Sequence, residues 1–107
     1  MADYTIVVLR AGNECRVWPP YQLIEKGGKV TWKNLTRDNI YVNFWEGDVL
    51  VPGSGPHPES FSKPIAAGGK ESAKVHATAP DGRHKYSIYC DETQSFAIGN
   101  SEPELDI

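Results

Sequence analysis

The sequence lacks the features that mark membrane-spanning, nucleic-acid-binding and disulfide-rich proteins. No apolar run approaches the roughly 20 residues that cross a bilayer, so we expect no membrane-spanning segment. Its 107 residues carry 11 Lys and Arg against 14 Asp and Glu, a formal net charge of −3. These charges are interspersed, so the chain has no basic stripe of the kind that binds nucleic acid. Its 2 cysteines do not form a disulfide framework and do not decide the compartment.

Signals for export and for catalysis are also missing from the sequence. The N-terminus has no basic segment followed by an apolar stretch, so we expect no signal peptide in this chain. That leaves open a cytoplasmic protein or an exported one whose signal has been removed. There is no Gly-x-Ser-x-Gly, His-Glu-x-x-His or phosphate-loop motif. Asp91 and Glu92 are adjacent on an extended or turning segment, so they point apart. We expect neither enzyme activity nor a cofactor.

Short β-strand patterns separated by turns make up most of the chain. Helical periodicity is almost absent, and the 8 prolines and 10 glycines favour a loop-rich β-protein. Residues 46–64 form the longest stretch without a strand pattern, and residues 105–107 are expected to pair as a final edge strand. This spacing predicts an all-β fold, a β-sandwich of seven to eight strands, as a single domain over residues 1–107. The other predicted strands are residues 4–9, 15–18, 30–33, 40–45, 72–77 and 84–90.

The alternation of side chains assigns several residues to the core. Trp32 follows a glycine turn on a predicted strand, and we expect it to be buried. Tyr86 shares an inward face with Ile88 and Cys90. Lysines 26, 29 and 33, by contrast, are interpreted as a solvated face rather than a binding patch.

Four segments, taken in order, carry a resemblance to a known family. They are residues 26–34 (KGGKVTWKN), 64–72 (PIAAGGKES), 82–90 (GRHKYSIYC) and 100–107 (NSEPELDI). In this order they resemble the glycine turns, the V-x-W/F-x-N strand, the cysteine strand and the final strand of the cupredoxins, the plastocyanin-like copper proteins. The resemblance implies a cupredoxin-like Greek-key β-sandwich in which Cys90 matches the copper cysteine.

The other ligand positions of that family do not hold ligands in this chain. The position of the first histidine falls on Ile40, and that of the second falls near Thr93 or Ser95. The methionine belongs near residues 97–99, but no histidine or methionine follows Cys90. A blue copper site needs two imidazoles beside the thiolate. Ile40, Cys90 and Thr93 are therefore interpreted as vestigial ligand positions, and we expect no bound metal.

Cys90 has three further interpretations in the sequence. It can be a small buried hydrophobic residue, since it shares a strand face with Tyr86 and Ile88. It can form a disulfide with Cys15, because the resemblance places both at one pole of the sandwich; the sequence does not decide whether their Cα atoms come close enough. A reactive thiol is disfavoured, because Asp91 and Glu92 would raise its pKa.

Two functions from different classes remain open. The first is a non-enzymatic cupredoxin-like domain without a type 1 copper site, acting as a structural or protein-interaction module. Its former copper pole would be filled by side chains of Ile40, Cys90, Thr93, Phe96 and the Gly12 turn and would face a protein partner. The alternative is a copper-binding protein with a rearranged, non-blue site that uses Cys90 and the upstream histidines, which are His57, His76 and His84.

Overall fold

The computed structural model describes residues 3–44, 50–51, 61–79, 81–97 and 103–107, and these consist of strands, turns and bends. The described residues include no helix long and apolar enough to cross a membrane. The strands in chain order are β1 (Asp3–Ala11), β2 (Glu14–Trp18), β3 (Tyr21–Leu23), β4 (Lys29–Asn34), β5 (Ile40–Phe44), β6 (Leu50–Val51), β7 (Phe61–Ile65), β8 (Lys70–Val75), β9 (Arg83–Lys85), β10 (Ser87–Cys90), β11 (Ser95–Phe96) and β12 (Glu104–Asp106).

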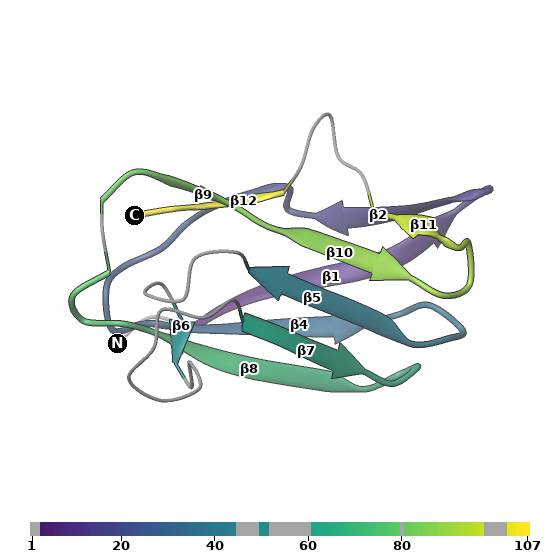
Figure 1. Ribbon diagram of the computed structural model, residues 1–107, viewed down its shortest axis with the longest axis horizontal. Coiled ribbons are helices and arrows are strands. Elements are labelled where there is room, and N and C mark those ends of the chain that lie inside the picture. Colours follow the sequence, from purple (N-terminus) through teal and green to yellow (C-terminus); the bar gives the residue numbers. More distant parts are fainter. Residues whose placement is uncertain (1–2, 45–49, 52–60, 80, 98–102) are drawn as a thin grey trace.

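The strands form two layers around one core (Figure 1). One layer is a 5-stranded sheet in the order β2-β1-β4-β8-β6. The other layer consists of a 4-stranded sheet, β11-β10-β5-β7, and a 3-stranded sheet, β3-β12-β9. The chain runs directly from β9 into β10 and so links these two smaller sheets. The expected all-β sandwich is confirmed, with the predicted strands divided into more numerous short segments.

The core follows from the two-residue alternation of the strands. In β4, Val30 and Trp32 point inward, while Lys29 and Lys33 are exposed. Trp32 and Tyr86 are 1% and 0% exposed, and their rings meet edge to face with centroids 5.8 Å apart. Trp32 Nε1 donates a hydrogen bond to Tyr86 Oη at 3.3 Å, and burial raises the pKa of that phenol. The prediction that both residues belong to the core is confirmed.

Three expectations about strands need correction. Residues 105–107 were expected at an edge, but β12 is the central strand between β3 and β9, with Leu105 fully buried. The stretch 46–64 contains β6 and most of β7; Pro64 is tolerated because β7 is an edge strand. The predicted strand 84–90 is interrupted at Tyr86, whose N–H donates to the Pro103 carbonyl at 2.9 Å. The predicted strand end at Trp45 lies outside the described residues.

Four connections gather at one end of the sandwich, the end away from both termini (Figure 1). They are residues 12–13, 35–39, 66–69 and 91–94, and we call this end the loop pole. Gly68 has a φ of 73°, a conformation that favours glycine. Its N–H donates to the Asn34 carbonyl at 2.9 Å, while the Asn34 N–H donates to the Gly69 carbonyl at 2.9 Å. The pole is therefore tied together by backbone hydrogen bonds.

Candidate functional site

The interior of the loop pole is lined by apolar side chains and two thiols. Ile40 begins β5, and its cross-strand partners are Cys90 on β10 and Ile65 on β7. Cys15 enters from β2. Ile40, Cys15 and Cys90 are each 0% exposed, and Ile65 is 2% exposed. The expected burial of Ile40 is confirmed, and its register places it directly opposite Cys90.

The structure brings the two cysteines together as free, buried thiols. Burial raises the pKa of Cys90 well above its usual range, and the neighbouring Cys15 thiol raises it further. Smaller contributions in the same direction come from Glu92 and Asp91. Because the thiolate is the reactive form of cysteine, this environment makes Cys90 a poor nucleophile at neutral pH. A disulfide between Cys15 and Cys90 stays a prediction.

The segment after Cys90 closes the pole mainly through its backbone. The Asp91 N–H donates to the Asn39 carbonyl at 3.0 Å. Thr93 is partly buried, and its hydroxyl is bonded to that of Ser95 at 2.8 Å. Phe96 was expected to fill the pole, and this is wrong, because its side chain is 57% exposed. It lies opposite Tyr89 on the outer face of β10, where the two rings are 5.3 Å apart.

Asn34 organises the connection between β4 and β5. It is fully buried, and its Nδ2 donates to the carbonyls of Asp38 at 2.7 Å and Ile65 at 2.9 Å. Its Oδ1 accepts from the N–H and the hydroxyl of Thr36, at 2.9 and 2.6 Å. The Asn34 side chain thus supplies hydrogen bonds to backbone groups that the turn leaves without backbone partners. It thereby fixes residues 35–39 and, with them, the positions of Ile40 and Arg37.

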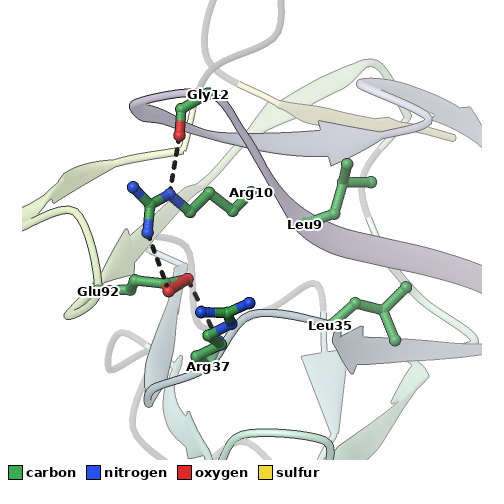
Figure 2. A pocket seen from close by; sticks show the side chains of 6 residues that line it. All are labelled: Leu9, Arg10, Gly12, Leu35, Arg37 and Glu92. Carbon is green, nitrogen blue, oxygen red and sulfur yellow. Dashed lines mark hydrogen bonds and ion pairs between the residues drawn. The ribbon is translucent and has the colours of Figure 1, made fainter.

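A pocket of about 480 Å³ opens on the outside of the same pole (Figure 2). Glu92 lies between two arginines there, and its side chain is only 10% exposed. Its Oε2 is 3.3 Å from Arg10 Nη1, and its Oε1 accepts from the Arg37 backbone N–H at 3.3 Å. Arg10 Nε also donates to the Gly12 carbonyl at 2.8 Å. The lining residues are Leu9, Arg10, Gly12, Leu35, Arg37 and Glu92.

The charges of this pocket are unevenly satisfied. Arg10 is neutralised by Glu92, whereas the Arg37 guanidinium forms no ion pair within the described part of the chain. Leu35 is 59% exposed and, together with Leu9, adds apolar surface. A guanidinium with free donors beside apolar surface is suited to bind a carboxylate in the bidentate geometry that arginine favours.

The histidines lie apart from this pole. His84 is buried on β9, and six residues of largely extended chain, about 20 Å, separate it from Cys90. His76 follows the end of β8 that is remote from the pole, and His57 lies outside the described residues. Among the residues that the structure describes, no three His, Cys, Asp or Glu side chains are grouped so that they could hold a metal ion.

The outer pocket was not predicted from the sequence. Arg10 and Arg37 are separated by 27 positions in sequence, and Glu92 lies 55 positions further along. Each is an ordinary surface residue in its own segment, and only the pairing of strands brings them together. The one local signal was the Asn34-x-Thr36 spacing, which is typical of side-chain-capped turns.

The comparisons with known proteins concern the fold. No protein-family model and no curated protein sequence matches this chain. Among solved structures, a reduced Cu(I) form of an amicyanin variant matches with a TM-score of 0.62 and 12% identity, over 99% of this chain and 82% of that one. A second amicyanin variant in its Cu(I) form gives a TM-score of 0.58 and 18% identity, over 99% and 84% of the two chains.

A purple cupredoxin from Nitrosopumilus maritimus matches with a TM-score of 0.56 and 15% identity, over 97% of this chain and 98% of that chain. These matches span nearly the whole chain, whereas the low identities carry no information about ligands or partners. They support the overall all-β arrangement described above. The chain therefore has a cupredoxin-like fold.

Proposed function

We propose that this protein is a non-enzymatic cupredoxin-like domain without a type 1 copper site, and that its loop pole binds a protein partner. The observation that carries the first half is Ile40, which is fully buried opposite Cys90 where the family resemblance expects a histidine. A type 1 site requires two imidazoles beside the thiolate and usually a weak thioether. Ile40 supplies no donor atom, and Thr93 supplies only a hydroxyl already bonded to Ser95. This donor set does not fit type 1 copper.

The outer pocket supports the second half of the proposal. Loops on a rigid sandwich commonly carry binding residues, because the sheets hold them in place. Here the Arg10–Glu92 pair anchors the loops, and the Arg37 guanidinium remains available beside Leu9 and Leu35. A partner that presents a carboxylate next to an apolar side chain would satisfy both features. The described lining residues of the pocket include no pairing of acid, base and nucleophile that would support catalysis.

A copper titration tests the first half. We expect the protein to stay colourless with stoichiometric Cu(II), because Ile40 faces Cys90 and no histidine follows Cys90 in the sequence. The measurement is visible absorption, with a Cys90→Ser variant as the matched control. An intense thiolate-to-copper band that disappears in Cys90→Ser would overturn the proposal.

Binding of a small peptide tests the second half. The probe is a capped Gly-Leu dipeptide with a free C-terminal carboxylate, and its amidated form is the control. We expect the free acid to shift the backbone amide NMR signals of residues 10–13, 35–37 and 91–93, and Arg37→Gln to remove these shifts. Equal shifts with the amide, or an unchanged response in Arg37→Gln, would reject this pocket as the binding site.

A second candidate function is metal binding at a non-blue site that uses Cys90. The observation that favours it is the contact between the buried Cys15 and Cys90 thiols, because soft thiolate ligands select Cu(I). The histidines described above do not join this pair. Competition with a Cu(I) chelator distinguishes the two functions: Cu(I) retained by the parent protein and released by both Cys15→Ser and Cys90→Ser would favour the metal function.

A further inference from the structure

The outer face of the 5-stranded sheet carries four lysines in a regular array. The register of β4 and β8 places Lys29 opposite Lys74 and Lys33 opposite Lys70. All four side chains are exposed. We call these four residues the lysine face.

The array has a defined geometry. Directly opposed residues of an antiparallel pair lie about 5 Å apart. Two positions four residues apart on one strand are separated by about 13 Å. At the centre of this rectangle, Thr31 Oγ1 and Ser72 Oγ are joined by a hydrogen bond of 2.8 Å. The face thus offers four ammonium groups around a polar centre.

This arrangement does not serve the stability of the fold. Like charges directly opposite each other across two strands are destabilising. None of the four lysines forms an ion pair within the ranges that the structure describes, although the chain carries an excess of carboxylates, 14 against 11 basic residues. On this sheet face, the described carboxylates are Asp3, beside Lys29, and Glu14, which is paired with Arg16. The repulsion between the lysines would be relieved by an external anion.

We propose that the lysine face docks an acidic protein segment in an extended conformation that runs along the direction of β4 and β8. This surface is separate from the outer pocket of the loop pole, and it goes beyond the function proposed above. In an extended segment, side chains on one face repeat about every 7 Å, so that carboxylates four residues apart match the 13 Å spacing of the lysines along each strand. The Thr31–Ser72 hydroxyl pair lies between them as a further hydrogen-bonding group.

The charge distribution favours a protein segment over a membrane or a nucleic acid. The whole chain has a net charge of −3, so a polyanion larger than the lysine face would also meet the chain's excess of carboxylates, whereas a short acidic segment can lie within the face. Screening limits each charge to about 8 Å at physiological ionic strength, so the lysine face acts on groups placed directly against it. The four lysines enclose hydroxyls rather than aromatic rings, which single-stranded nucleic acids use for stacking.

The test uses a fluorescein-labelled peptide of six Glu-Thr repeats, with fluorescence anisotropy at low ionic strength as the measurement. We expect the parent protein to bind this peptide and the affinity to fall with added salt. The variant Lys33→Gln/Lys70→Gln should bind about tenfold more weakly, since two exposed charge pairs are lost. The control Arg83→Gln/Lys85→Gln removes two positive charges from β9 in another sheet and should bind as the parent does.

Three outcomes would overturn the proposal: no binding by the parent, equal affinity for parent and Lys33→Gln/Lys70→Gln, or an equal loss in the β9 control. Vesicles of phosphatidylserine and phosphatidylcholine and a duplex DNA of 20 base pairs are tested in parallel; binding of either without binding of the peptide also overturns the proposal.

Thermal melting checks the fold, and we expect Lys33→Gln/Lys70→Gln to melt no lower than the parent because a repulsion is removed. Peptide-induced shifts of the β4 and β8 amides in NMR spectra locate the contact independently.

Discussion

The two ends of the sandwich differ in whether their described residues bury a carboxylate. At the loop pole, where the fold family resemblance expects metal ligands, the buried side chains are those of Ile40, Cys15 and Cys90. At the opposite end, β12 buries a carboxylate: Glu104 is 5% exposed, and Asp106 lies beside it on the same face of the strand. Among the described residues, the buried polar side chains of the pole, Asn34 and Thr36, are uncharged, whereas the same small core accommodates a carboxylate elsewhere.

The carboxylates of β12 are only partly satisfied. Glu104 Oε2 and Asp106 Oδ1 have no hydrogen-bond partner within the described part of the chain, and Arg83 Nε approaches Glu104 Oε2 no closer than 3.9 Å. Burial raises the pKa of Glu104, and the neighbouring Asp106 raises it further, against a smaller opposing effect of Arg83 and Lys85. A proton held by Glu104 relieves the repulsion between the two carboxylates. This end of the molecule is thus sensitive to pH, whereas in the pole interior Ile40 has no titratable group and the raised pKa of Cys90 keeps its thiol protonated at neutral pH.

The largest expected effect comes from the buried core that the two ends share. Trp32→Ala removes the buried partner of Tyr86 and should lower the free energy of unfolding by about 3–5 kcal/mol. Urea denaturation measures this loss in the free energy of unfolding, and the losses expected from substitutions at the two ends are compared with it. The matched control is Trp18→Ala, because Trp18 is 67% exposed and its loss should change stability by about 0.5 kcal/mol or less. A Trp32→Ala protein that melts within a few degrees of the parent would contradict the assigned core.

A smaller loss is expected at the loop pole. Ile40→His places an imidazole without a partner between Cys90 and Ile65 and should cost about 2–4 kcal/mol. Ile40→Val, which keeps the pole apolar, should cost only about 0.5–1.5 kcal/mol. One imidazole and one thiolate leave copper under-coordinated, so Ile40→His alone should give no blue band. The double variant Ile40→His/Thr93→His tests whether these two positions lie close enough to bind one metal ion together. A stable, blue Ile40→His protein would show that the pole is not closed by packing.

The sequence predicted the interior of the pole better than its surroundings, for a physical reason. The alternation that includes Ile40 and Val42 determines which side chains point inward, and this local rule holds whichever strands are neighbours. The contact of Arg10 with Glu92 and the opposition of Lys33 to Lys70 depend on which strands pair and in which register. Those pairings are set by the whole core, so no single segment encodes them.

The same limit applies to short strands. β3 and β11 contain 3 and 2 residues, too few for a two-residue alternation to be recognised. β12 was predicted as a strand but placed at an edge, because the three residues that it spans do not reveal neighbours on both sides. Its central position explains why Glu104 is buried at all: strands β3 and β9 cover it from both sides.

The smallest effect should appear at the carboxylate end and only above acidic pH. Because the pKa of Glu104 is raised in the folded state, the folded protein holds this proton over a pH range in which the unfolded chain has released it. Near or below the ordinary glutamate pKa of about 4.3, the group is neutral in both states and costs nothing; stability is then lost as the pH rises through the folded pKa.

Glu104→Gln keeps the shape of the side chain and removes this loss. We expect the variant to match the parent near pH 4 and to be more stable at pH 7, by less than either loss above, as measured by urea denaturation at both pH values. Glu25→Gln, at an exposed carboxylate, should show no such difference between the two pH values. Equal stability of Glu104→Gln and the parent across this range would mean that Arg83 and Lys85 neutralise the pair. The two ends would then differ in the polarity of their buried side chains but not in how their stability responds to pH.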